Sequence, residues 1–292
     1  MSASQSLPLI LKAYLNTSLG QLHYRYYLPH PTPAPLRTSA PRSPILLLHM
    51  SASSSLSFTT LIRSLSTLGH PCYAPDMPGF GSSFSPTTSP PNIAWYASLY
   101  HTAFAQLAGF ENGCHILGHH SGAIIGTELA NGERYGGFVQ SLTCVGPAVL
   151  SEGQRVDMAR TFLDPFNRPV ASGEHLLKTW EYLQWEGLSP GSDLELLHRE
   201  TLDHVRAWKG RSQIYRCVWD FDCEEALGLV VDKKRVLGLC ARDDVLWPYF
   251  EQFKAVGGGL RGEVIKGGNF GPDLDWEGIL KWFVPFIDEI EL

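Results

Sequence analysis

The sequence predicts an α/β fold, in which a mostly parallel, doubly wound sheet carries an inserted helical lid. Short apolar runs alternate with amphipathic stretches over residues 45–145, and the alternation resumes from residue 235. This rhythm is typical of parallel strands joined by helices that cover both faces of a sheet. Between the two parts, residues 151–228 hold three or four amphipathic stretches, with no clear strand among them.

Each element follows from its local pattern. Residues 13–16 and 21–27 alternate around a Leu-Gly turn and predict a hairpin, while the six prolines of residues 29–44 predict an exposed loop. Ser57 is the expected cap of the first helix. The other expected strands are 45–49, 72–75, 114–117, 138–145, 235–240 and 263–265. The expected helices are 57–68, 93–108, 121–133, 175–185, 194–208, 247–256 and 276–290.

We therefore divide the chain into three parts. Residues 1–150 form the first part of the α/β core and contain the proline-rich loop 29–44, residues 151–228 form the lid, and residues 229–292 complete the core. We expect the lid to lie over the carboxyl ends of the strands, because open α/β sheets bind their ligands at that edge.

Composition excludes several classes of protein. The 23 Lys and Arg against 29 Asp and Glu give a net charge of −6, which argues against a nucleic acid partner. A hydrophobic content of 44% excludes a disordered chain. The N-terminal residues do not resemble a signal peptide, and no apolar run approaches the ~18 residues that span a membrane. We expect a cytoplasmic monomer or homodimer with no membrane partner.

The six cysteines form no CxxC pair and no zinc-site spacing, so we expect free, buried thiols in a reducing compartment. The chain also has no Walker loop, no GxGxxG after its first strands and no cluster of metal ligands. We therefore expect neither a cofactor nor a metal.

The main chemical motif is Gly-His-His-Ser-Gly at residues 118–122, between an expected strand and an expected helix. A Gly-x-X-x-Gly sequence at such a junction predicts a nucleophile elbow, a strained turn that projects its middle side chain into the active site. Here the middle residue is His120.

With three further segments, the chain resembles the α/β-hydrolase superfamily. Residues 46–49 are similar to the strand before the oxyanion loop, and residues 74–83 resemble the Asp-x-Pro-Gly-x-Gly-x-Ser turn. Residues 236–244 resemble the strand and loop that deliver the catalytic acid. The resemblance covers the chain apart from the proline-rich loop and implies an α/β-hydrolase fold.

The resemblance also implies a catalytic triad, from which this chain departs at two positions. The acid maps onto Asp244, with Asp243 as the second choice, but Asn269 stands where the family has its histidine. No G-x-S-x-G occurs, so a serine hydrolase is not expected. We expect His120, Asp244 and Asn269 to be catalytic, with Asp244 orienting His120 and Asn269 bonding either His120 or a substrate carbonyl.

An oxyanion hole is expected next to the elbow. The resemblance implies that the backbone amide of Ser121 is one donor and that the loop at Met50 and Ser51 supplies the other, with His49 as a hydrogen-bonding neighbour. Ser121 itself lies one residue past the apex, where a helix turns the side chain by about 100° away from the site.

These residues predict proton transfer at His120, as base, acid or both. The leading expectation is a cofactor-independent lyase, isomerase or cyclase acting by aldol, dehydration or cyclisation steps on a small apolar carbonyl compound. Two alternatives stay open. One is a hydrolase that cleaves an ester or C–C bond with water activated by His120, and the other is a non-catalytic ligand-binding protein on a hydrolase scaffold.

Overall fold

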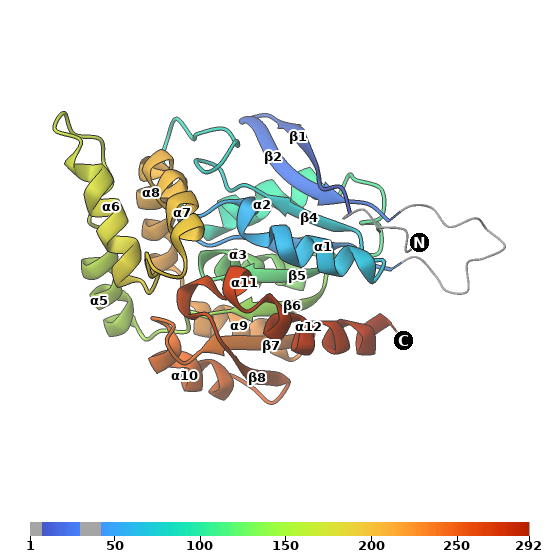
Figure 1. Ribbon diagram of the computed structural model, residues 1–292. Helices are drawn as coiled ribbons and strands as arrows, with labels where there is room; N and C mark the ends of the chain where they lie inside the picture. Colours follow the sequence, from blue (N-terminus) through green and yellow to red (C-terminus); the bar gives the residue numbers. More distant parts are fainter. Residues whose placement is uncertain (1–7, 30–41, 292) are drawn as a thin grey trace, which may run out of the picture.

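Eight strands form one sheet with helices on both faces (Figure 1). The computed structural model describes residues 8–29 and 42–291. The strand order is β1-β2-β4-β3-β5-β6-β7-β8, with β1 and β2 antiparallel to their neighbours and the rest parallel. The strands are β1 (Leu11–Thr17), β2 (Gly20–Tyr27), β3 (Ile45–Leu48), β4 (Cys72–Pro75), β5 (Cys114–His119), β6 (Val139–Val145), β7 (Arg235–Ala241) and β8 (Leu260–Ile265). The expected fold class is confirmed.

The helices divide between the two faces. Buried side chains of α1 and α12 pack together on one face, while those of α2, α3, α9 and α10 belong to the cluster on the other. The α-helices are α1 (Thr59–Thr67), α2 (Ile93–Phe104), α3 (Ser121–Leu129), α4 (Gly132–Tyr135), α5 (Glu152–Phe162), α6 (Glu174–Trp185), α7 (Leu194–Arg206), α8 (Trp208–Asp220), α9 (Cys223–Val231), α10 (Phe250–Ala255), α11 (Gly271–Leu274) and α12 (Trp276–Glu291). Short 3-10 helices are η2 (Ser55–Phe58), η3 (Trp247–Tyr249) and η4 (Gly268–Phe270).

The start of the first helix differs from the expectation. Ser57 is not the cap: Ser54 caps the 3-10 helix η2 that precedes α1, because its extended backbone lets the hydroxyl accept a hydrogen bond from Leu56 N at 3.4 Å, and α1 itself has no side-chain cap. The hydroxyl of Ser57 instead donates to Ser54 O at 2.9 Å within the 3-10 turn. The proline-rich loop expected at 29–44 lies largely outside the described residues.

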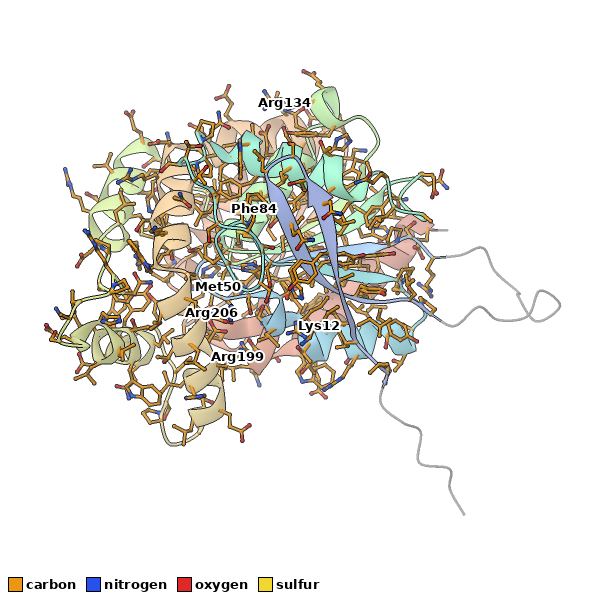
Figure 2. All side chains as sticks on the ribbon, turned by 90° about the horizontal axis from the view of Figure 1, so that it is seen from above. Lys12, Met50, Phe84, Arg134, Arg199 and Arg206 are labelled. Atoms are coloured by element: carbon orange, nitrogen blue, oxygen red, sulfur yellow. The ribbon has the colours of Figure 1, made fainter. Side chains whose placement is uncertain are left out.

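Helices α5 to α8 gather at one end of the sheet (Figure 1), and α7 is fastened to the core by polar contacts. Ser53 Oγ donates to Glu200 at 2.9 Å, and Arg199 Nη1 donates to Asp273 at 2.8 Å. Met50, labelled in Figure 2, packs with apolar side chains of α6 and α7. The boundaries expected for the lid stay a prediction, and α9 crosses the second of them.

All six cysteines are free and buried, as expected. In the part of the chain that the structure describes, no helix has the length and apolar character needed to cross a membrane.

A buried carboxylate organises the turn that follows β4. Asp76 is 2% exposed and accepts hydrogen bonds from His23 Nδ1 at 2.7 Å, Ser55 N at 2.7 Å and Ser82 N at 2.8 Å. Gly81 has φ +49, and a Cβ there would lie 2.1 Å from Asp76 Oδ2. Asp76 therefore joins β2, the start of η2 and the turn.

Replacing Asp76 by Asn should lower the free energy of unfolding by about 3 kcal/mol, because an amide cannot satisfy three donors as a carboxylate does. Burial alone would raise the pKa of Asp76, but the hydrogen bond from His23 and the other donors hold it well below its usual value. The stabilisation is therefore complete above the unfolded-state pKa of about 3.9 and is lost as the pH falls through the lower folded-state value.

Urea unfolding at neutral and acidic pH measures this difference. The exposed Asp232→Asn is the matched control and should change stability by less than about 0.5 kcal/mol. Equal stability of the Asp76 and Asp232 variants at neutral pH would contradict the role given to Asp76.

Candidate active site

The elbow between β5 and α3 is built as the sequence predicts. His120 has φ 48° and ψ −112°, and it is the only non-glycine residue with positive φ among residues 8–29 and 42–291. The glycines on either side are required by close packing. A Cβ on Gly122 would lie 2.1 Å from Leu48 O, and a Cβ on Gly118 would lie 2.5 Å from Gly122 O.

The structure brings His120 and Asp244 together. Nε2 of His120 lies 2.9 Å from Oδ2 of Asp244, whose other oxygen accepts a hydrogen bond from Leu246 N at 2.7 Å. Gly146, at the end of β6, leaves room for the ring, because a Cβ there would lie 2.4 Å from His120 Nε2. Asp243 is exposed, so the geometry favours Asp244 as the acid.

The carboxylate partner controls the protonation of His120. Burial alone would lower the pKa of His120, but the charge and hydrogen bond of Asp244, with the charge of Glu186, raise it above its usual value. Within the described residues, Nδ1 of His120 forms no hydrogen bond to protein. Nδ1 is therefore the ring nitrogen available to a bound molecule.

His119 lies beneath this ring. Its centroid is 4.6 Å from that of His120, and it is 1% exposed. Burial and the neighbouring imidazole of His120 lower the pKa of His119 well below its usual value, so it stays neutral. Its position suits a residue that packs against the elbow and supports it.

Asn269 does not bond to His120. Its Oδ1 accepts a hydrogen bond from Val245 N at 3.0 Å. Its Nδ2 donates to the backbone oxygen of Glu186 at 2.9 Å and to Glu186 Oε2 at 2.7 Å. Asn269 thus links the loop that carries Asp244 to the end of α6.

The expected oxyanion hole is partly closed by a side chain. Ser51 N, one of the expected donors, donates to the hydroxyl of Ser121 at 2.7 Å. Ser121 is the first residue of α3, where backbone amides have no acceptor within the helix. A bound oxygen atom would therefore meet the amide and the hydroxyl of Ser121 rather than two backbone amides. The expectation that the side chain of Ser121 turns away from the site is wrong, because Ser121 lines the pocket beside His120.

His49 has a structural position. Its Nδ1 donates to Met50 O at 2.7 Å, and its Nε2 accepts from Met77 N at 2.8 Å. Burial lowers its pKa, so the ring is neutral and both nitrogens are used within the protein. His49 shapes the oxyanion loop and does not line the pocket.

Sequence reasoning missed Glu186, which follows α6. Its side chain lines the same pocket as His120, and its Oε1 is buried without a hydrogen-bond partner in the described part of the chain. Burial raises the pKa of Glu186, and Asp244 adds to this, while Tyr182, His120 and Arg211 act in the opposite direction. The only feature of the local sequence that marks Glu186 is its place before Gly187, and a glutamate before glycine is common where a helix ends.

The pocket encloses about 600 Å³ of space between atoms, including the part that opens to solvent. Its polar lining includes His120, Ser121, Glu186 and Asn269, together with Ser51, Tyr182, His204 and Tyr215. Its apolar walls come from α3, α5, α6 and α8 and include Ile124, Met158, Phe162, Leu183, Val218 and Trp219. Such a site suits a small, largely apolar molecule with one oriented polar group.

One group of side chains has metal-ligand geometry, but it lies away from this pocket. His70, Asp288 and Glu291 place ligand atoms within 4.8 Å of one another. Nη1 of Arg42 already bonds to all three, at 2.9 Å from His70 Nε2 and 3.3 Å from Glu291 Oε2. The guanidinium occupies the position that a cation would take.

Solved structures of similar fold are hydrolases by name. An enol-lactonase from Burkholderia xenovorans LB400 is 15% identical, with a TM-score of 0.73 over 94% of this chain and 100% of that one. An esterase from Exiguobacterium antarcticum is 17% identical, with a TM-score of 0.73 over 97% and 100%. A hydrolase from Pseudomonas aeruginosa PA01 is 16% identical, with a TM-score of 0.70 over 98% and 99%. At these identities the likeness shows the fold alone.

The comparison of sequences gives the family. No curated protein matches the chain significantly. A family model described as the alpha/beta hydrolase family matches residues 45–277, which include the elbow, the lid, Asp244 and Asn269. The match covers well over half of the 292 residues, so this chain belongs to the alpha/beta hydrolase family.

Proposed function

We propose that this protein is a cofactor-independent hydrolase of a small, largely apolar ester or lactone, in which His120 activates water. The observation that carries the proposal is the bond between His120 and Asp244 at the elbow, which orients a basic imidazole at the pocket. The family and its esterase and lactonase neighbours support hydrolysis over the lyase or isomerase chemistry that the sequence alone favoured.

The residues divide the reaction between them. Nδ1 of His120 takes a proton from water as the water oxygen attacks the carbonyl carbon, and Asp244 stabilises the imidazolium that forms. The amide of Ser121 would donate to the developing oxyanion. Its hydroxyl accepts from Ser51 N and keeps its own proton to donate to the same oxygen.

A serine mechanism is not supported by this arrangement. Ser51 and Ser121 both line the pocket, and Ser121 Oγ already accepts a hydrogen bond from Ser51 N. In the described residues no imidazole is hydrogen-bonded to that hydroxyl, so no base is placed to activate it.

A fluorophosphonate probe should therefore leave the native protein unlabelled, because it reacts with activated serines. Intact-protein mass spectrometry with and without the probe measures this directly. Stoichiometric labelling that maps to Ser121 would overturn the water mechanism in favour of an acyl-enzyme.

His120→Gln should lower kcat/KM by at least about 10²-fold, because the amide cannot accept the proton. In the native enzyme kcat/KM should rise with pH through one ionisation whose midpoint lies above 6.5, because the fold raises the pKa of His120. The rise should be absent in the Gln variant.

Asp244→Asn provides the matched control for this profile. Without the carboxylate charge, burial dominates, so the midpoint should move to lower pH while a rise remains. An unchanged rise in the folded His120→Gln variant would exclude His120 as the base. If the native protein shows no turnover and the His120→Gln variant keeps the same ligand affinity, the chain is a binding protein instead.

Acid–base chemistry without hydrolysis is a second candidate, favoured by the lack of a placed side-chain nucleophile beside His120 in the described structure. Turnover in water enriched in oxygen-18 separates the two. A hydrolase should introduce one solvent oxygen into the acid product, whereas a lyase, isomerase or cyclase acting by aldol or cyclisation steps should introduce none.

A further inference from the structure

We infer that Glu186 is a second catalytic group, which protonates the departing alcohol oxygen, and that Asn269 is its positioning residue. The inference rests on the proposed hydrolysis and adds the acid that this reaction needs. A lid residue, rather than the family's third triad position, supplies it.

The geometry holds one oxygen of Glu186 and leaves the other for a ligand. Asn269 Nδ2 donates to Oε2 at 2.7 Å and to the backbone oxygen of the same residue at 2.9 Å. These two bonds fix both the side chain and the backbone of Glu186. Oε1 is buried and has no hydrogen-bond partner within residues 8–29 and 42–291, although the residue lines the pocket. A buried polar atom of this kind costs free energy until a ligand pairs with it.

The surroundings raise the pKa of the Glu186 carboxyl. The elbow, the acid loop, α6 and α8 each place a titratable or charged group near the carboxyl. These groups are His120, Asp244, Tyr182, Tyr215 and Arg211. Burial raises the pKa of Glu186 above its usual value despite the opposing effects of Tyr182, His120 and Arg211. Base and acid thus lie in one pocket, which is the arrangement expected of paired proton-transfer groups.

The step balances with water as the only co-substrate. The water oxygen bonds to the carbonyl carbon while its proton moves to Nδ1 of His120. The bond from that carbon to the alcohol oxygen then breaks, and the proton of Glu186 moves to the departing oxygen. The imidazolium proton returns through solvent to the Glu186 carboxylate, so one ester and one water give one acid and one alcohol.

Two esters with the same acyl group test the inference, because only a basic leaving oxygen needs an acid. Glu186→Gln should lower kcat/KM for butyl butanoate by about 10²-fold, but for 4-nitrophenyl butanoate by less than about threefold. The change should remove any fall in kcat/KM at alkaline pH for the butyl ester. Glu181→Gln, at an exposed glutamate of α6, is the matched control and should leave both rates unchanged.

The ratio of the two rates does not depend on the fraction of folded protein, so partial unfolding cannot imitate the result. An equal loss on both esters would overturn the role of Glu186 while leaving hydrolysis by His120 intact. If His120→Gln instead leaves kcat/KM unchanged for both esters, the proposed function is overturned. Asn269→Ala should reproduce the selective loss on the butyl ester to a smaller extent, and an equal loss on both esters would exclude a positioning role.

A measurement without substrate tests the acid itself. In protein labelled with carbon-13 at glutamate carboxyls, the signal that disappears in Glu186→Gln should titrate with a midpoint above the usual value of about 4.3. A midpoint at or below that value would overturn the inference, whichever ester the enzyme accepts.

Discussion

The strained backbone at His120 is the constraint on which the site depends. A non-glycine residue at positive φ costs about 1–3 kcal/mol, and histidine is among the side chains that occur there more often. The conformation is held by β5 on one side and α3 on the other, with Gly118 and Gly122 allowing backbone contacts that a Cβ would block. The same turn places the ring against Asp244 and the Ser121 amide at the start of a helix. The position of the proposed base and that of the proposed oxyanion donor therefore cannot be changed independently.

Burial acts on the pKa values of the two proposed proton-transfer groups, His120 and Glu186, in opposite ways. It disfavours the charged form of each group, which lowers the pKa of an imidazole and raises that of a carboxyl group. At His120 the bonded Asp244 outweighs burial and the pKa rises, whereas at Glu186 burial itself is the main cause of the rise. The rise in the pKa of His120 therefore depends on one specific partner, whereas the rise in the pKa of Glu186 depends on burial.

The parts of the site that follow from local sequence could be predicted, and those that depend on packing between distant segments could not. The elbow is a strand–turn–helix junction, so its glycines and His120 were visible, and Asp244 follows directly from the end of β7. The bond between Ser51 and Ser121 joins residues 70 positions apart, and no local pattern encodes it. Glu186 reaches the pocket only because α6 lies over the sheet edge and Asn269 holds it there.

The substitutions at positions 120 and 269 fit each other physically. A histidine at 269 that served the triad would have to share Asp244 with His120, because one carboxylate orients one imidazole in that arrangement. With asparagine there, Oδ1 accepts from Val245 N beside Asp244, and Nδ2 reaches the lid. The residue at position 269 thus stays bonded to the loop that carries Asp244, and it holds Glu186 instead of transferring a proton. Because His120, at the apex of the elbow, carries no hydroxyl, the proposed hydrolysis takes its nucleophile from solvent.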